Sequence, residues 1–517
     1  MFKTAELGRK VAKAEYRDLA PALRQELLEV QQELKQNNRF PVIILFAGVD
    51  GAGKSEMVNL MNEWMDPRWL VTRAYGEPSD EEQERPEFWR FWRDLPPRGR
   101  IGLFLSAWYH RPLIDRVYQR IDEITFFRRL ERILTMGDML MDDGALIIKF
   151  WMHLSRDEQR KRLKNLEKDP LTRWRVHKQD WDHWKLYDRF IETAEHIIRH
   201  TSTGRSTWNI VEGKDSYYRA LTVGTIIRDA IRHHLSGHTL KEQWQNDLAA
   251  RGEELQRNPV PTISTVAATI GQSSTHLTVL SQLDMSLSQG KKDYNKALKT
   301  YQSKLNLLQR QAHEQGVSTI LVFEGPDAAG KGGAIRRITA ALDARHYLVR
   351  PIAAPTDEER QHHYLWRFWR LLSRAGRVTI FDRSWYGRVL VERVEGFASE
   401  EEWRRAYGEI NDFEDHLLEH GIVLAKFWLH ITKDEQLARF QDREQTPYKR
   451  WKLTDEDWRN RERWEDYELA VNDMLAYTNT RRSPWTLVEG NDKRHARIKI
   501  LKTVCEALET RLASAQP

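Results

Sequence analysis

The sequence has one cysteine, Cys505, in 517 residues. A lone cysteine excludes an internal disulfide and is typical of a reducing compartment. No stretch approaches the roughly 18 consecutive apolar residues that a membrane-spanning helix requires. Residues 1–19 have a charged, helical pattern without the apolar core of a signal peptide. We therefore expect a cytoplasmic protein that makes no contact with a membrane.

Net charge is also scarce, because 82 Lys and Arg side chains face 76 Asp and Glu, giving +6 at neutral pH. This small excess of positive charge is compatible with a polyanionic partner but does not identify one. Tryptophan, by contrast, is abundant at 20 residues, many of them at matched positions of a repeat. Large aromatics at such positions are most simply interpreted as packing residues.

The chain is one unit written twice. Gly48 and Gly325 open similar glycine-rich motifs 277 positions apart. The same offset relates FWRFWR at Phe88 to LWRFWR at Leu365, and KFWMHL at Lys149 to KFWLHI at Lys426. An offset held over so many positions indicates two copies of one fold. Where the copies differ, they indicate which one kept its chemistry.

Each copy alternates a helical pattern with short apolar strands. Helical spacing of leucines covers 16–36 and 294–315, and apolar runs follow near 41–48, 101–108, 145–154 and 208–213, with their counterparts 277 positions on. Such alternation predicts an α/β fold in which helices cover both faces of a parallel sheet. The predicted domains are 1–235 and 286–517, joined by a connection rich in Pro, Ser, Thr and Gly over 236–285.

Both copies carry a loop that suits phosphate. GVDGAGKS begins at Gly48 and GPDAAGKG at Gly325, each between an apolar strand and a helix. Glycines let the backbone amides turn inward, the helix start adds positive potential, and the lysine reaches the outer phosphates. In the second copy the predicted phosphate-binding residues are Gly325, Ala328, Ala329, Gly330, Lys331 and Gly332. Ser55 keeps the hydroxyl that usually ligates Mg²⁺, whereas Gly332 lacks it.

Only the second copy keeps the expected metal carboxylate. Asp382 directly follows an apolar strand, the position at which phosphate-loop enzymes hold Mg²⁺, and Arg383 comes next. The first copy has Leu105 and Ser106 at these places. Asp327 lies inside the loop, where a carboxylate is costly unless it holds metal or accepts a substrate proton. We therefore predict Asp327, Lys331, Asp382 and Arg383 as catalytic residues, with Asp382 and Asp327 as metal ligands.

A basic stretch follows the third strand of each copy. In the second copy it supplies Arg439, Arg443, Lys449, Arg450 and Lys452. The first copy has Leu166 for Arg443 and Thr172 for Lys449. Enzymes with a phosphate loop often place a mobile basic lid here, although a solvated charged face is the simpler alternative. We predict Arg443, Lys449 and Lys452 of this lid, together with Arg388, as binding residues for phosphate or nucleotide.

These motifs resemble the polyphosphate kinase 2 family. Its marks are read here as GPDAAGKG from Gly325, FDRSWYGR from Phe381 and PYKRWK from Pro447. The resemblance implies two tandem P-loop kinase-like domains, each with a basic helical lid. It further implies Mg²⁺-dependent transfer of a phosphoryl group from inorganic polyphosphate to AMP, because two-copy members resemble polyphosphate:AMP phosphotransferases. The first copy is then catalytically degenerate, while GMP as acceptor and a homo-oligomer stay open.

Three alternatives stay open beside this interpretation. A polyphosphate-dependent ADP or GDP kinase has the same motifs, and so does an ATP-dependent nucleotide kinase. A nucleic-acid-binding protein with vestigial loops belongs to another class. It is disfavoured because Asp382 and Asp327 add negative charge where a phosphate backbone would lie, and we expect no nucleic-acid partner.

Overall fold

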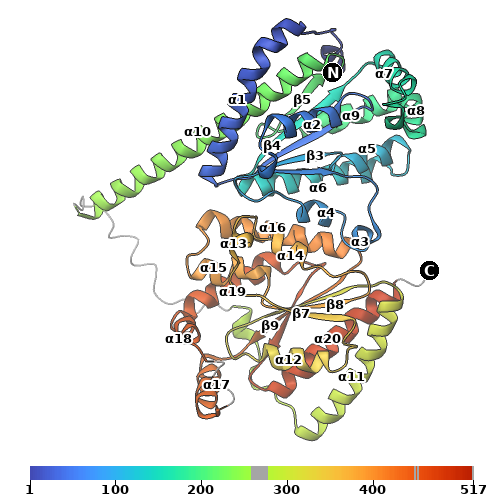
Figure 1. The fold of residues 1–517 in the computed structure, drawn as a ribbon. Helices are drawn as coiled ribbons and strands as arrows, with labels where there is room; N and C mark the ends of the chain where they lie inside the picture. Colours follow the sequence, from blue (N-terminus) through green and yellow to red (C-terminus); the bar gives the residue numbers. More distant parts are fainter. Residues whose placement is uncertain (258–277, 448–449, 451–452, 515–517) are drawn as a thin grey trace. The chain divides into compact units, whose positions relative to one another are not determined.

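A computed structural model describes residues 1–257, 278–447, 450 and 453–514, and for 238–257 it describes the backbone alone. By their internal contacts, two compact units can be distinguished (Figure 1). The N-terminal unit comprises Met1–Pro78 and Phe91–Gln272 with Gln361–His363, and the C-terminal unit comprises Ser79–Arg90, Ser273–Arg360 and Tyr364–Pro517. Among the described residues, no helix combines the length and the apolar character that crossing a membrane requires.

Each unit is built on a five-stranded parallel sheet, which confirms the predicted fold class. The N-terminal sheet has the order β2-β3-β1-β4-β5, and the C-terminal sheet has the matching order β7-β8-β6-β9-β10. The N-terminal strands are β1 (Val42–Gly48), β2 (Leu70–Ala74), β3 (Ile101–Leu105), β4 (Leu146–His153) and β5 (Trp208–Glu212). The C-terminal strands are β6 (Thr319–Glu324), β7 (Tyr347–Pro351), β8 (Val378–Asp382), β9 (Val423–His430) and β10 (Trp485–Glu489).

Helices cover both faces of each sheet, as the buried central strands require. In the C-terminal unit α11 (Lys291–Glu314), α12 (Lys331–Thr339) and α20 (Lys493–Ala513) pack together on one face, and α16 (Glu400–Glu419) and α19 (Trp464–Thr478) lie on the other (Figure 1). In the N-terminal unit α1 (Lys13–Asn37), α2 (Lys54–Trp64) and α10 (Ser216–Arg257) pack together, as do α5 (His110–Val117), α6 (Glu123–Asp142) and α9 (Tyr187–Thr201).

The core of the C-terminal unit lies between its sheet and the helices α11, α12 and α20. Phe323 and Phe427 stack at a ring-centroid distance of 5.2 Å and an interplanar angle of 24°, both fully buried. They belong to the same buried apolar cluster as Ile338 of α12 and Ile500 of α20. Burying side chains of this size stabilises the unit by about 1.5–3 kcal/mol each. This packing fixes the strand ends on which the polar residues of the site stand.

Two features differ from the sequence prediction. Strands β2 and β7 were not expected, because they are short, carry polar residues and lie at the sheet edge, where only one neighbour buries them. Helix α10 continues to Arg257, so 236–257 of the predicted irregular connection is helical. Of the rest of that connection, 258–277 lies outside the described residues, and 278–285 contains the short 3-10 helix η5 (Leu280–Gln282).

Candidate functional site

The C-terminal glycine loop joins β6 to α12 by a tight path. Gly325 has φ of 149°, and a Cβ on it would lie 2.5 Å from the carbonyl oxygen of Leu429. Gly330 caps α12 with φ of 111°. Both positions therefore require glycine. The Lys331 ammonium donates to the carbonyl oxygens of Gly325 at 2.5 Å and Pro326 at 3.3 Å, so it is held across the loop mouth beside the first amides of α12.

Asp327 in the loop is fixed by two donors from different elements. Arg383 Nη2 donates to its Oδ1 at 3.0 Å, and Asn460 Nδ2 from α18 (Asp455–Glu462) donates to its Oδ2 at 2.9 Å. Burial alone would raise the pKa of Asp327, but Lys331, Arg383 and Asn460 outweigh burial and lower it. The carboxylate is therefore ionised at neutral pH.

Two carboxylates stand at the carboxyl ends of neighbouring strands. Asp382 is the last residue of β8 and Glu324 the last of β6, and Phe323 pairs with Asp382 in the parallel register. Glu324 is 5% exposed and accepts a hydrogen bond from Ser384 Oγ at 2.8 Å. Burial raises the pKa of Glu324. The sequence prediction missed Glu324, although the alanine that the first copy has at the matching position, Ala47, was an available signal.

The left-handed backbone of Arg383 follows from its place at the end of the strand. Its φ is 64°, an uncommon value for a residue other than glycine. The conformation turns the chain so that the guanidinium reaches Asp327 in the loop. The matching Ser106 of the N-terminal unit has φ of 53°, so the turn belongs to the fold that the two units share.

Arg439 of α17 (Lys433–Gln445) supports the loop from below. Its guanidinium is buried and donates to the carbonyl oxygens of Ala328 at 2.8 Å, Ala329 at 3.0 Å, Gly490 at 2.6 Å and Asn491 at 3.0 Å. Five donors in a planar fork suit a cluster of carbonyls. The sequence placed Arg439 in the basic stretch, and the structure assigns this residue to holding the loop.

The other predicted binding residues lie in different surroundings. Arg388 contacts Glu392 at 3.2 Å and stacks on Tyr364, outside the cavity described below. Arg443 lies 3.9 Å from Asp457. Lys449 and Lys452 lie outside the described residues, so their roles stay predictions.

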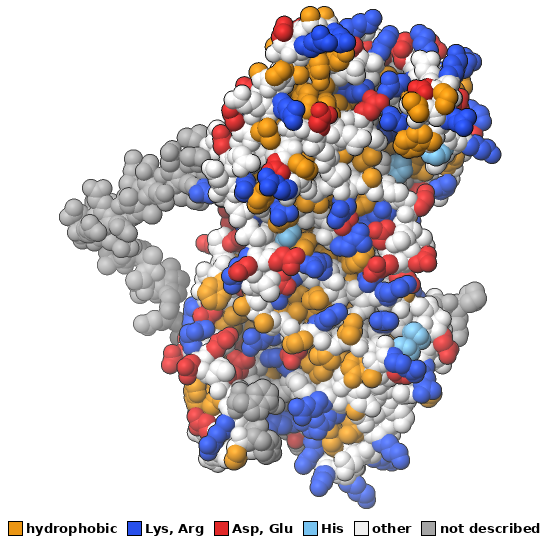
Figure 2. Space-filling model, in the orientation of Figure 1, with side chains coloured by type: hydrophobic (Ala, Val, Ile, Leu, Met, Phe, Trp, Pro, Cys, Tyr) orange, Lys and Arg blue, Asp and Glu red, His pale blue; other side chains and the backbone are white. Residues whose placement is uncertain are grey.

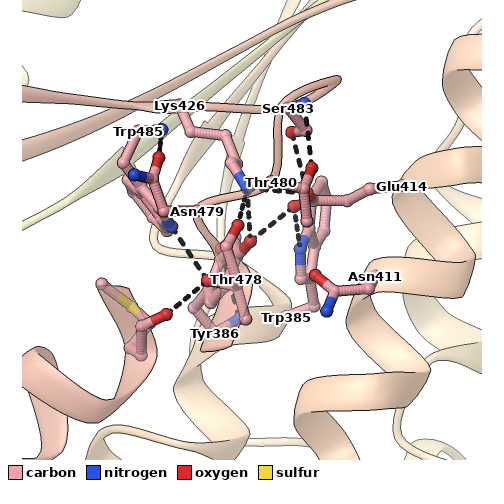
Figure 3. A network of polar contacts seen from close by, with 12 residues as sticks. Trp385, Tyr386, Asn411, Glu414, Lys426, Thr478, Asn479, Thr480, Ser483 and Trp485 are labelled. Carbon is pink, nitrogen blue, oxygen red and sulfur yellow. Dashed lines mark hydrogen bonds and ion pairs between the residues drawn. The ribbon is translucent and has the colours of Figure 1, made fainter. Parts of the chain in front are cut away.

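A buried polar network holds the segment that follows Asp382 (Figure 3). Glu414 of α16 accepts from Trp385 Nε1 at 3.1 Å and from the Tyr386 hydroxyl at 2.7 Å. Lys426 of β9, fully buried, donates to Glu414 at 2.8 Å, to the Tyr386 hydroxyl at 2.9 Å and to the Thr478 carbonyl at 2.9 Å. These hydrogen bonds give Glu414, Lys426 and Tyr386 buried partners, and they anchor the two residues after Ser384.

A cavity of about 110 Å³ opens beside the C-terminal glycine loop, and we call it the C-terminal cavity. Its lining includes Glu324, Asp327, Arg383 and Asn460, and it is closed by apolar and aromatic side chains, among them Trp428, Trp464 and Tyr467. A glycine loop with a lysine, a carboxylate on the neighbouring strand and an adjoining cavity define a phosphate-loop kinase-like protein. Among the described residues, no three acidic, histidine or cysteine side chains converge enough to form a metal site by themselves.

The N-terminal loop keeps the shape without the carboxylates. Lys54 donates to the carbonyl oxygens of Gly48 at 2.6 Å and Val49 at 3.2 Å, as Lys331 does in its own loop. Ala47 and Leu105 occupy the positions of Glu324 and Asp382. A metal ion would find neither strand-end carboxylate here.

Comparison with known proteins places the chain in a family. The family model of polyphosphate kinase 2 (PPK2) matches residues 10–238 and again residues 288–516. The chain therefore belongs to the polyphosphate kinase 2 family, and it is an enzyme that transfers phosphate from polyphosphate to nucleotides.

Relatives of known name cover the whole chain. The polyphosphate:AMP phosphotransferase of Pseudomonas aeruginosa is 49% identical over 509 residues, covering 98% of this chain and 99% of that protein. The polyphosphate:AMP phosphotransferase of Pseudomonas syringae pv. tomato is 46% identical over 516 residues, covering 99% of both. A crystal structure described as polyphosphate kinase 2 from Pseudomonas aeruginosa PA01 matches over 100% of both chains, with a TM-score of 0.86 and 46% identity.

Proposed function

We propose that the chain transfers a phosphoryl group from inorganic polyphosphate to AMP, giving ADP, in its C-terminal unit. The observation that carries this proposal is full-length similarity, across both repeats, to proteins named polyphosphate:AMP phosphotransferase. The asymmetry of the two loops supports the choice of unit, because only the second has Glu324, Asp382 and Arg383 around it.

In this proposal Lys331 and the loop amides bind the phosphoryl group, and Arg383 neutralises charge as it transfers. Phosphoryl transfer depends mainly on positioning and electrostatic stabilisation, so fixed cations beside the loop are the main requirement. The lowered pKa of Asp327 makes it a weak base. A phosphate monoester is already mostly deprotonated at neutral pH, so no base is required. We therefore assign Asp327 to orienting Arg383 and the acceptor and to sharing the metal.

The residues present fit Mg²⁺, which we propose as the cofactor. Mg²⁺ is commonly held by one or two carboxylates together with substrate phosphates and water, so a preformed cage of protein ligands is not needed. Asp382 would hold the ion, with Asp327 and the buried Glu324 beside it. When bound, the ion would neutralise negative charge on the polyphosphate and the acceptor.

Cationic side chains near the loop support a polyanionic donor. Figure 2 shows Lys and Arg side chains gathered over the part of the C-terminal unit where α12 lies, and this helix carries Arg336 and Arg337. We propose that these side chains, with Arg388, Arg443, Lys449 and Lys452, guide the polymer to Lys331. Exposed charges of this kind raise the local concentration of a polyanion in a salt-dependent way.

We also propose the division of labour between the repeats. Residues 286–517 form the catalytic domain, 1–235 a catalytically degenerate one, and 236–285 their connection. A cytoplasmic location is proposed from the composition, and the single thiol, Cys505, is buried.

Product analysis tests this function directly. AMP, ADP and GMP are offered separately with polyphosphate and Mg²⁺, and ATP replaces polyphosphate in a parallel series. We expect ADP from AMP, with kcat/KM for AMP exceeding that for ADP by more than about tenfold, a difference of roughly 1.4 kcal/mol in transition-state binding. ATP as the main product from ADP would contradict the acceptor. Equal turnover with ATP as donor would contradict the polyphosphate assignment.

A further inference from the structure

The N-terminal unit contains a cavity of about 230 Å³ at its own glycine loop. This N-terminal cavity is bounded by the loop residues Gly48, Asp50 and Lys54, and its walls include the aromatic side chains of Tyr187 and Phe190. The proposed reaction makes no use of it, because Leu105 stands where a metal carboxylate would be needed. The side chains that line it include two with a buried polar group that has no hydrogen-bond partner among the described residues.

The first group is an imidazole nitrogen. His183 is buried, with 9% of its side chain exposed, and its Nδ1 lies 2.7 Å from Asp50 Oδ2. Its Nε2 is buried and has no hydrogen-bond partner among the described residues. The matching residue of the C-terminal unit is Asn460, whose Oδ1 accepts from the Tyr467 hydroxyl at 3.3 Å. Phe190 stands at the position of Tyr467, so the N-terminal unit has lost that hydroxyl.

The second group is an amide oxygen, which has likewise lost the partner that its C-terminal counterpart keeps. Gln159 is 2% exposed and donates through Nε2 to the carbonyl oxygen of Asp50 at 3.1 Å. Its Oε1 is buried and, within the described parts of the chain, unbonded. Gln436 in the C-terminal unit makes the same donation, but its Oε1 accepts from Arg461 Nη1 at 3.3 Å. Trp184 replaces Arg461. A buried polar atom without a partner is costly, and a hydrogen bond from a bound ligand would recover that cost.

The two unbonded atoms have the same hydrogen-bonding character. Burial would raise the pKa of Asp50, but Lys54 and the hydrogen bond of His183 outweigh it and hold the pKa at about 2. An ionised Asp50 accepts from Nδ1–H of His183, and in that tautomer of the uncharged ring Nε2 carries the lone pair that accepts. Gln159 Oε1 is an acceptor as well. The cavity therefore seeks a ligand with N–H or O–H donors. Polyphosphate, which carries only acceptor oxygens at neutral pH, does not offer them.

The charge of the cavity suits phosphate without metal. Glu324, Asp327 and Glu468 line the C-terminal cavity, and these carboxylates repel phosphate unless a cation intervenes. Among the described residues that line the N-terminal cavity, Asp50 is the single carboxylate. Its charge is compensated by Lys54, whose Nζ lies 3.6 Å from Asp50 Oδ1, and its other oxygen contacts His183 Nδ1. The loop amides and the start of α2 then act on a bound anion without a metal bridge.

We propose that the N-terminal cavity binds a nucleoside monophosphate without metal and without transferring its phosphate. The loop with Lys54 holds the phosphate, Tyr187 and Phe190 contact the planar base, and amino or hydroxyl groups of the nucleoside donate to His183 and Gln159. A cavity of this volume approaches the size of pockets that enclose small ligands, whereas a polymer needs an open track.

AMP binding to the full chain in EDTA tests this site. The Lys331→Ala variant weakens binding at the C-terminal loop, and equilibrium dialysis then reports the remaining AMP. We expect a site whose affinity falls at least tenfold when Lys54→Ala is added. We also expect hydrogen exchange to slow at residues 48–56 on AMP addition. No AMP binding in EDTA, or affinity unchanged by Lys54→Ala, would overturn the proposal.

Two further arms test the ligand class and the unbonded groups. Adenosine and tripolyphosphate are compared with AMP, and each should bind at least tenfold more weakly, since each lacks half of the recognised groups. Tripolyphosphate binding tighter than AMP would overturn the assignment. Phe190→Tyr restores the side chain that the C-terminal unit has at this place, so the fold is expected to tolerate it. Its hydroxyl would bond His183 and lower AMP affinity severalfold, and an unchanged affinity would remove His183 from the site.

Discussion

The two units have matching sheets and loops, yet their loops are held by different side chains. In the C-terminal unit, Arg439 bonds the carbonyls of Ala329 and Gly490. In the N-terminal unit, Arg219 of α10 bonds the matching carbonyls, Ala52 at 3.4 Å and Gly213 at 2.6 Å. One guanidinium has replaced another from a separate helix.

The replacement involved several compensating changes. Arg162, the counterpart of Arg439, donates to Glu56 at 2.5 Å, and Arg219 donates to the other oxygen of Glu56 at 2.5 Å. Position 333, which matches Glu56, is glycine, and position 496, which matches Arg219, is alanine. The N-terminal loop was thus rebuilt around new ion pairs while the metal carboxylates disappeared. Keeping a phosphate loop in shape without its catalytic groups is what a binding site requires.

Removing the matched lysines tests most directly whether the two loops have different roles in catalysis. Lys331→Ala and Asp382→Ala should each lower kcat by about 10²–10³-fold, because each removes a preorganised charge from the transition state. Lys54→Ala should lose less than about tenfold. Steady-state turnover of AMP with polyphosphate measures all three. A loss in Lys54→Ala comparable to that in Lys331→Ala would mean that both loops take part in catalysis.

The buried lysines of the two units also differ in their partners. Lys426 is paired with Glu414, whereas the N-terminal unit has Lys149 and Gly137 at the two matching positions. Lys149 is 3% exposed, and its ammonium donates to the Thr201 carbonyl at 2.6 Å. Burial lowers the pKa of Lys149 to about 8. The network that anchors the segment after Asp382 has therefore lost its centre in the unit that lost the aspartate.

Identical substitutions at these positions should act with opposite sign. Lys426→Met leaves Glu414 buried without its cation and should destabilise the C-terminal unit by about 3–5 kcal/mol. Lys149→Met removes a poorly compensated charge. Its lowered pKa corresponds to roughly 3 kcal/mol, offset in part by the lost hydrogen bond, so a gain of about 2 kcal/mol is expected at pH 7. Native-state hydrogen exchange of the backbone amides in each sheet measures the change in stability of each unit. Destabilisation by both variants would refute the contrast.

A smaller effect is expected in the pH dependence of the stability of the N-terminal unit. The pKa of Lys149 is about 8 in the folded unit and near its usual 10.5 when unfolded. Between these values the unfolded chain binds more protons, so the unit gains stability as pH rises from about 8. Below pH 8 both states are protonated and the full penalty applies. The stability difference between wild type and Lys149→Met should therefore shrink from pH 8 to pH 9.5. A constant difference across this range would contradict the assignment.

The sequence predicted the two sheets and the strand-end positions of Asp382 and Arg383, because strands that run directly into glycine loops leave little freedom. It missed the edge strands β2 and β7, whose polar side chains mask the strand pattern. It also missed Glu324 and Glu414. Both are single acidic residues in apolar or helical contexts, and their partners lie far away in sequence. A contact that exists only in three dimensions leaves no local pattern.

The smallest effect is expected from restoring the lost residues of the N-terminal loop. Leu105→Asp with Ser106→Arg, in a Lys331→Ala background, should return no more than about 1% of wild-type turnover. The restored aspartate would still face Ala47 instead of a carboxylate, and Gly137 instead of Glu414 would leave the following segment without its anchor. Each missing electrostatic group costs about 10²–10³-fold. As controls, Ala47→Glu, Gly137→Glu or both are added to this variant. AMP turnover of each variant is compared with that of Lys331→Ala alone. Substantial activity from the first pair would mean that Asp382 and Arg383 suffice for catalysis, and that Glu324 and the network around Lys426 contribute stability alone.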